Sequence, residues 1–174
     1  MKDSRTIEFC DQDYTVETAR MDGKTVRYRA WKHLVYVTKP VDPEYQRMNL
    51  YVPEAYYEDP DSQPFSLDTA PILMPNGVGG YMPGEPQLPG PTFTGCMNAA
   101  FYGLMNGYVI AAPAARGRGL RDEKGCFTGT APACIVDLKA AVRYLRHNKE
   151  KVPGNVERII SNGTSAGGAL SSLL

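Results

Sequence analysis

The sequence predicts an α/β fold in which short antiparallel strands open a mostly parallel sheet with helices on its faces. Two patterns lead to this prediction. Residues 25–52 hold short alternating or β-branched runs between turn residues, which is typical of antiparallel strands. From residue 70 onward, short and wholly apolar runs alternate with longer segments of helical periodicity, the order found in parallel sheets. No internal repeat opposes this fold class.

The opening strands are predicted at residues 25–30, 34–38 and 48–52, because Asp-Gly, Lys-Pro and Val-Pro pairs bound them. The first strand of the parallel part is expected at residues 70–74. This run is wholly apolar, as a strand buried on both faces must be, and Pro75-Asn76-Gly77 ends it. A long loop rich in glycine and proline then follows.

A helix is expected after this loop. Its apolar face consists of Met97, Phe101, Leu104 and Met105. Gly107 is placed to end this helix, and residues 108–112 form the next buried strand. Pro132 can open a second helix. The apolar stripe of the second helix consists of Ile135, Leu138, Val142 and Leu145. After Pro153-Gly154, a strand is expected at residues 156–162 and a third helix at residues 166–174.

Charge and composition exclude several classes of partner. The 19 Lys and Arg residues balance 19 Asp and Glu residues, so the sequence predicts no general attraction to nucleic acid or to an anionic membrane. With 43% hydrophobic residues, the chain has the composition of a single packed domain over residues 1–174. No apolar stretch has the length of a membrane span, and residues 1–17 lack the apolar core of a secretory signal. A cytoplasmic location is therefore expected.

The four cysteines do not form a recognisable metal or disulfide pattern. They are Cys10, Cys96, Cys126 and Cys134. Their spacing matches neither a CxxC motif nor a small disulfide scaffold, so we expect four reduced thiols buried as small apolar side chains. No cluster of His, Cys and carboxylate residues has metal-ligand spacing, and the sequence predicts neither a metal nor a cofactor.

The motif most closely tied to chemistry is Gly163-Thr164-Ser165-Ala166-Gly167, a G-x-S-x-G pattern between an expected strand and an expected helix. In this context Ser165 is a candidate nucleophile on a sharp strand-to-helix turn. Gly163 and Gly167 are elbow glycines, which leave room where a Cβ would clash with the neighbouring chain. The alternative is an ordinary Gly-rich turn whose serine caps the helix.

A second candidate element is the Gly-rich loop at residues 75–81. In serine hydrolases of this topology, such a loop supplies one N–H group to the oxyanion hole, and the residue after the nucleophile supplies the other. Gly80 and Ala166 are the candidates. A dinucleotide fingerprint starting at Gly77 would need glycine where Met82 stands, and no Walker A lysine follows. The alternative is a turn without a catalytic role.

Two further features have weaker functional meaning. Arg116-Gly117-Arg118-Gly119 could indicate RNA binding, but a single RGRG in a charge-balanced chain is more typical of arginines that brace a loop beside the site. Neither histidine is well placed as a catalytic base. His33 lies in the antiparallel region, and His147 is expected on the surface near the end of the second helix, where it complements the helix dipole.

The segments APILMPNGVGGYMPG, RGRG, APACIVDLKAAVRYLRHN and RIISNGTSAGG, in this order, resemble the bacterial tannases (tannin acyl hydrolases), serine esterases of the α/β-hydrolase fold. A weaker likeness begins at about Val26, so the resemblance covers nearly the whole chain. It implies hydrolysis of small galloyl or related phenolic esters through an acyl-enzyme. It also implies that Ser165 is the nucleophile and that the N–H groups of Gly80 and Ala166 form the oxyanion hole.

The sequence departs from this family at its end. In α/β-hydrolases the acid and the histidine of the triad follow the serine well beyond the elbow, whereas Leu174 is the last residue here. We therefore expect an N-terminal part of the fold, truncated after the nucleophile elbow and inactive alone. It would self-associate or need a complementing C-terminal portion. The alternatives are a fragment of a carboxylesterase or feruloyl esterase, and a non-catalytic α/β interaction module.

Overall fold

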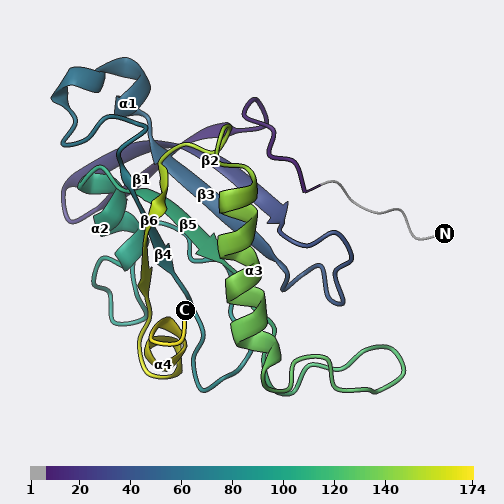
Figure 1. Cartoon of the computed structure of the whole chain (residues 1–174). Coiled ribbons are helices and arrows are strands. Elements are labelled where there is room, and N and C mark those ends of the chain that lie inside the picture. The colour runs from purple at the N-terminus through teal and green to yellow at the C-terminus, as the bar shows by residue number, and fades with distance from the viewer. Residues whose placement is uncertain (1–6) are drawn as a thin grey trace.

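The computed structural model describes residues 7–174, in which six strands form one sheet with the order β1-β2-β3-β5-β4-β6 (Figure 1). The strands are β1 (Thr15–Met21), β2 (Lys24–Val35), β3 (Arg47–Pro53), β4 (Pro71–Pro75), β5 (Val109–Pro113) and β6 (Asn155–Asn162). The helical elements are α1 (Ala55–Glu58), the 3-10 turn η1 (Pro60–Ser62), α2 (Ala99–Met105), α3 (Ala133–His147) and α4 (Ala166–Ser171). Residues 1–6 lie outside the described residues. They belong to the segment, residues 1–17, that is expected not to be a secretory signal.

Separate hydrophobic cores cover the two faces of the sheet. Side chains alternate along β3, so Leu50 packs in the core that contains Leu145 of α3, whereas Tyr51 packs in the core that contains Phe101 of α2. A third, smaller core joins α3 to α4 through Leu138 and Leu170. The helices α2 and α3 therefore cover opposite faces of the sheet, and α4 lies on the α3 side.

The sheet is mixed, so the prediction of a mostly parallel sheet is wrong for the described residues. The pairs β1–β2, β2–β3 and β3–β5 are antiparallel, and only β5–β4 and β4–β6 are parallel. The crossover from β4 to β5 carries α2, and the crossover from β5 to β6 carries α3 and places β6 on the far side of β4. The antiparallel opening is confirmed and extends one pair further into the sheet than the sequence predicted.

Two details of the antiparallel opening differ from the prediction. The strand expected at residues 34–38 is not separate, because β2 continues through an irregularity between Trp31 and Leu34 and ends at Val35. Beyond it the chain turns inward, and the Tyr36 hydroxyl lies 2.9 Å from the carbonyl oxygen of Ala114. The sequence also did not indicate β1, since this edge strand is largely exposed and lacks a regular apolar alternation.

The elements of the second half are confirmed with small shifts at their ends. β4, β5 and β6 lie within one residue of the predicted ranges. α3 begins directly after Pro132, and Gly107, with φ of 75°, follows the end of α2. The last helix is shorter than expected, since α4 ends at Ser171.

Most of the cysteines are exposed, which corrects the expectation that all four are buried. Cys10, Cys96 and Cys126 are exposed free thiols, and only Cys134 is buried. The three exposed cysteines lie in irregular segments, where no periodicity in the sequence reports burial. Burial raises the pKa of the Cys134 thiol to about 11.

Thiol titration should separate these two groups. At pH 8, Cys10, Cys96 and Cys126 should react quickly with an aromatic disulfide reagent, whereas Cys134 should react about a hundredfold more slowly because it is buried and rarely a thiolate. In urea all four thiols should react at similar rates. A native chain that titrates four thiols in one fast phase would show that the α3–α4 core does not cover Cys134.

None of the helices within residues 7–174 has the length and hydropathy needed to cross a membrane.

Candidate active site

A pocket lies where the chain leaves the carboxyl ends of two neighbouring parallel strands, β4 and β6. Its volume is about 830 Å³. Its walls come from the loop after β4, the turn after β6 and the loop that leads into α2. The lining residues are Asn76, Gly77, Val78, Gly79, Gln87, Leu88, Pro91, Thr92, Phe93, Asn98, Asn162, Gly163, Thr164 and Ser165. Open α/β sheets bind their ligands at this end of the strands.

Ser165 occupies the tip of the turn between β6 and α4 and is exposed. Its backbone has φ of 56° and ψ of −122°, a left-handed conformation that L-residues rarely adopt. The next residue, Ala166, begins α4, so its N–H group has no acceptor within the helix. The turn therefore places the Ser165 residue at the pocket, and the next residue carries a backbone N–H group without an acceptor in the helix.

The turn depends on close approach at both flanking glycines. A Cβ on Gly163 would lie 2.5 Å from the carbonyl carbon and oxygen of Gly167 and 2.7 Å from Nδ2 of Asn76. A Cβ on Gly167 would lie 2.6 Å from Oδ1 of Asn76. Real Cβ atoms do not approach other atoms this closely, so neither position has room for a side chain.

The Gly-rich loop after β4 forms a tight turn over residues 79–82. Gly80 and Tyr81 both have left-handed φ angles, 57° and 58°, and the Met82 N–H donates to the Gly79 carbonyl at 2.9 Å. Gly79 lines the pocket and Gly80 follows directly after it. Arg118 Nε donates to the Gly80 carbonyl at 2.8 Å, and the Arg118 N–H donates to the Tyr81 carbonyl at 2.8 Å. The arginine thus fixes the orientation of this turn.

The first arginine of the RGRG segment is tied to α3 by a buried ion pair. Arg116 Nη2 lies 2.8 Å from Oδ1 of Asp137, and its Nε and backbone N–H both donate to Oδ2 at 2.9 Å. Gln46 Nε2 donates to Oδ1 at 2.9 Å. The hydrogen bonds to Asp137 raise the pKa of Arg116. The expectation that these arginines brace a loop is confirmed.

Neither histidine reaches the pocket. His33 has φ of 60° at the irregular point of β2, where its ring contacts Arg47. His147 lies half-exposed in the last turn of α3, with Nε2 3.4 Å from Oε1 of Glu8. The residues that line the Ser165 pocket include no histidine, aspartate or glutamate. Residues 7–174 therefore bring no general base to Ser165, and they hold no cluster of three or more potential metal ligands.

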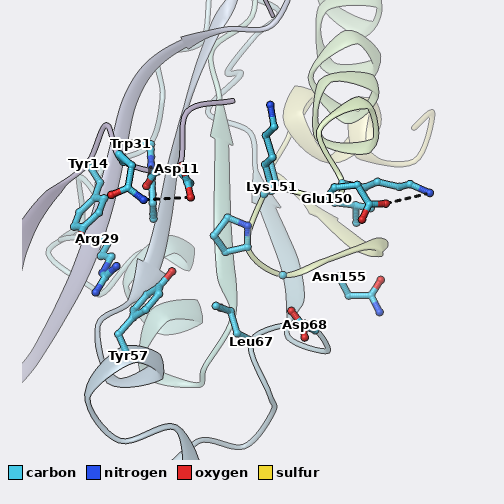
Figure 2. Close-up of a pocket in the computed structure, with 16 residues that line it drawn as sticks. Asp11, Tyr14, Arg29, Trp31, Tyr57, Leu67, Asp68, Glu150, Lys151 and Asn155 are labelled. Carbon is cyan, nitrogen blue, oxygen red and sulfur yellow. Dashed lines mark hydrogen bonds and ion pairs between the residues drawn. The ribbon is translucent and has the colours of Figure 1, made fainter. Parts of the chain in front are cut away.

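A second pocket, of about 600 Å³, lies at the opposite end of β6, beside Asn155 and Val156 (Figure 2). Its Arg29 is already paired with Glu54 at 3.0 Å and stacked 3.4 Å over the Tyr57 ring. The indole of Trp31 donates to the Asp11 carbonyl. These groups satisfy one another, and the pocket lies at the amino end of the strand, so the Ser165 pocket is the candidate active site.

Comparison with known proteins places this geometry in a family. A family model described as BD-FAE, a hydrolase domain, matches residues 92–174. The solved tannase of Fusobacterium nucleatum is 48% identical over 97% of this chain, with a TM-score of 0.92. This chain belongs to the tannase family.

Other tannase structures agree. The tannase of Lactobacillus plantarum is 40% identical over 97% of this chain, with a TM-score of 0.87. A tannin acyl hydrolase in complex with ethyl gallate is 40% identical over 96%, with a TM-score of 0.88. This tannase-family chain spans 35%, 36% and 37% of the lengths of the F. nucleatum, L. plantarum and ethyl gallate-bound proteins. A comparison with curated proteins gave no match. The mixed sheet with helices on both faces is α/β-hydrolase-like, and the family is one of esterases.

Sequence reasoning missed two polar side chains that organise this tannase-family site. Asn76 and Asp137 are both buried, at 6% and 0% exposure. Asn76 follows β4 at the carboxyl end of a parallel strand, a position that could have marked it in the sequence. Asp137 lies beside the predicted apolar stripe of α3, where a charged residue is normally taken as solvated. Its partner, Arg116, is distant in the sequence, so no local pattern signals the pair.

Proposed function

We propose that this chain supplies the nucleophile and the oxyanion-binding elements of a serine esterase that acts on galloyl or related phenolic esters. The substrate class comes from the relatives, which include tannin acyl hydrolases in complex with ethyl gallate and with 3,4-dihydroxybenzoate. The observation that carries the proposal is the strained backbone of Ser165 at the edge of the pocket. Proteins retain such strain at functional sites, where the surrounding structure imposes it.

In the proposed reaction, Ser165 Oγ bonds to the ester carbonyl carbon while its proton passes to a general base, and the carbonyl oxygen becomes an oxyanion. Collapse of this intermediate releases the alcohol, which takes up the proton, and leaves the acyl group on Ser165. Water then attacks the acyl-enzyme and releases the acid. We assign the oxyanion N–H donors to Gly80 and Ala166. Neither N–H group has an acceptor among residues 7–174, which supports this assignment.

The general base and its carboxylate partner are proposed to lie outside these 174 residues, in a portion that follows the nucleophile elbow. The pocket lining offers no titratable side chain, and both histidines lie elsewhere. Serine without a base is a weak nucleophile. The 174-residue chain alone should therefore be nearly inactive, because residues 7–174 bring no general base to Ser165.

Joining this chain in frame to the remaining portion of the F. nucleatum tannase tests the proposal. The 174-residue chain should hydrolyse methyl gallate at close to the background rate, and the joined enzyme should be active. Ser165→Ala should lower kcat of the joined enzyme at least about a thousandfold. The control, Ser172→Ala, removes an exposed hydroxyl bonded only to the Gly168 carbonyl and should keep full activity.

Loss of activity in a well-folded His147→Ala variant of the joined enzyme would show that the base lies within this chain. An active Ser165→Ala variant would refute the nucleophile assignment. Activity of the 174-residue chain that falls a thousandfold on Ser165→Ala would contradict the proposal that the base is external.

We also propose that β6 pairs with a further strand, from a complementing C-terminal portion or from a second copy of the chain. β6 is the last strand of the described sheet, and Ile160 on it is 45% exposed. An apolar groove of about 520 Å³, lined by Leu73, Tyr102 and Ile160 among others, flanks this edge. An unpaired strand edge can hydrogen-bond to a strand of another chain. A net charge of zero gives little electrostatic repulsion against such association.

Sedimentation of the 174-residue chain at micromolar concentration should therefore show self-association. Amide exchange at Ile159 and Ile160 should slow when the chain associates or when the remaining portion is joined. A monodisperse monomer that protects both amides strongly would show that β6 needs no further strand.

A further inference from the structure

The side chain of Asn76 lies between the two halves of the proposed site. Its Nδ2 lies 3.2 Å from the carbonyl of Asn162, 3.1 Å from that of Gly167 and 3.0 Å from Oγ of Ser171. The first acceptor precedes Ser165 in the chain, and the other two follow it. One amide group thus connects the end of β6 with α4 across the base of the turn that carries Ser165.

The space that Asn76 fills is the space that the two flanking glycines leave. A Cβ on Gly163 would lie 2.7 Å from its Nδ2, and a Cβ on Gly167 would lie 2.6 Å from its Oδ1. The side chain is 6% exposed, and Oδ1 has no hydrogen-bond partner among residues 7–174. The amide is therefore held by its donor end, with its acceptor end packed against the Gly167 backbone.

The backbone of Asn76 ties the same residue to the Gly-rich loop. Its N–H donates to the Asn162 carbonyl at 2.8 Å, continuing the β4–β6 pairing, and Gly77 to Gly80 follow directly. Asn76 thus contacts the turn that carries one proposed oxyanion donor and leads directly into the loop that carries the other. A shift of about 1 Å between such groups is enough to cost catalysis severely.

We infer that Asn76 is a positioning residue, which sets the strained turn of Ser165 relative to the Gly-rich loop through its side-chain amide. This inference rests on the proposed function, since it assumes that Ser165 is the nucleophile. The chemistry requires a donor at Nδ2: a carboxylate of the same shape would face the Asn162 and Gly167 carbonyl oxygens without a hydrogen to offer. Asparagine is the residue that fits both the slot and its acceptors.

Asn76→Asp in the joined enzyme tests this role, because the two side chains have the same shape. We expect kcat to fall at least about a hundredfold while KM stays within about twofold, since the substrate contacts are retained and the transition-state donors are displaced. The matched control is Asn148→Asp. Asn148 is also buried, at 3% exposure, and its side chain bonds Phe9, Ile7 and Tyr144, far from the site in the fold. It should lower the thermal midpoint without lowering kcat of the folded enzyme.

A second variant decides the matter if Asn76→Asp does not fold. Ser171→Ala removes one of the three acceptors and should lower kcat about three- to tenfold at unchanged KM. The inference is overturned if folded Asn76→Asp keeps kcat within about threefold of the parent, or if its KM rises as much as its kcat falls. If Asn76→Asp does not fold, full activity of Ser171→Ala overturns the inference. Activity in Ser165→Ala would instead refute the proposed function. This result distinguishes a failure of the nucleophile assignment from a failure of the Asn76 role.

Discussion

Replacing Gly163 by valine is expected to abolish folded yield or to lower kcat of the joined enzyme by orders of magnitude. The new Cβ would lie 2.5 Å from backbone atoms of Gly167 and 2.7 Å from the Asn76 amide, so the turn itself must move. Both neighbours are fixed, one in α4 and the other by three hydrogen bonds. No relaxation of a flexible side chain can absorb the clash.

Gly90→Val is the matched control for this prediction. Gly90 lies in the loop that leads into α2, and a Cβ there has nothing within 4 Å. The Gly90→Val variant should fold and keep its activity. The effect of Gly163→Val is measured as soluble yield, thermal midpoint and kcat. Parental kinetics in Gly163→Val would mean that the turn at Ser165 is not the tight one described above.

Removing the buried carboxylate of Asp137 should have the largest effect on stability. Arg116 is only 8% exposed, and Asp137→Ala removes the carboxylate that pairs with its guanidinium. The same substitution leaves Gln46 Nε2 without its acceptor. Breaking a buried pair in this way costs about 3–5 kcal/mol of the free energy of unfolding. That is a large part of the stability of a typical domain, about 5–15 kcal/mol.

An exposed pair provides the contrast. Arg27 and Glu58 lie 2.6 Å apart, and both side chains are 52% exposed, so Glu58→Ala should cost only about 0.2–1 kcal/mol. Urea unfolding followed by circular dichroism compares the two variants. If Asp137→Ala lowers the unfolding midpoint no more than Glu58→Ala does, the ion pair does not hold the 116–118 segment in place.

The fold was predictable where each element carries its own signal. The buried strands β4 and β5 are short apolar runs, and α3 has both a proline start and an apolar stripe, so local sequence places them well. β6 is more exposed, but Pro153-Gly154 before it and the Gly-rich turn after it mark its ends. Strand direction is not a local property. The antiparallel β3–β5 pairing joins strands distant in the sequence, and β1 is held by β2 rather than by a pattern of its own.

The candidate site shows the same division. A five-residue motif indicates Ser165 and its two glycines, because consecutive residues form the turn. Asn76 and Arg118 act across distances of 38 to 95 residues in the sequence, through side-chain and backbone contacts that only the folded chain reveals. Their residue types, an asparagine after a strand and an arginine between glycines, are also common in loops without such a role.

The central claim is that Ser165 carries the acyl group during ester hydrolysis. The joined enzyme should be mixed with methyl gallate, quenched in acid within the first turnover and digested, and the peptide that contains Ser165 examined by mass spectrometry. We predict a galloyl group on Ser165 that appears before free gallate and is absent from Ser165→Ala. An active enzyme that shows no acyl group at any time, or one that carries it on another residue, would contradict this claim.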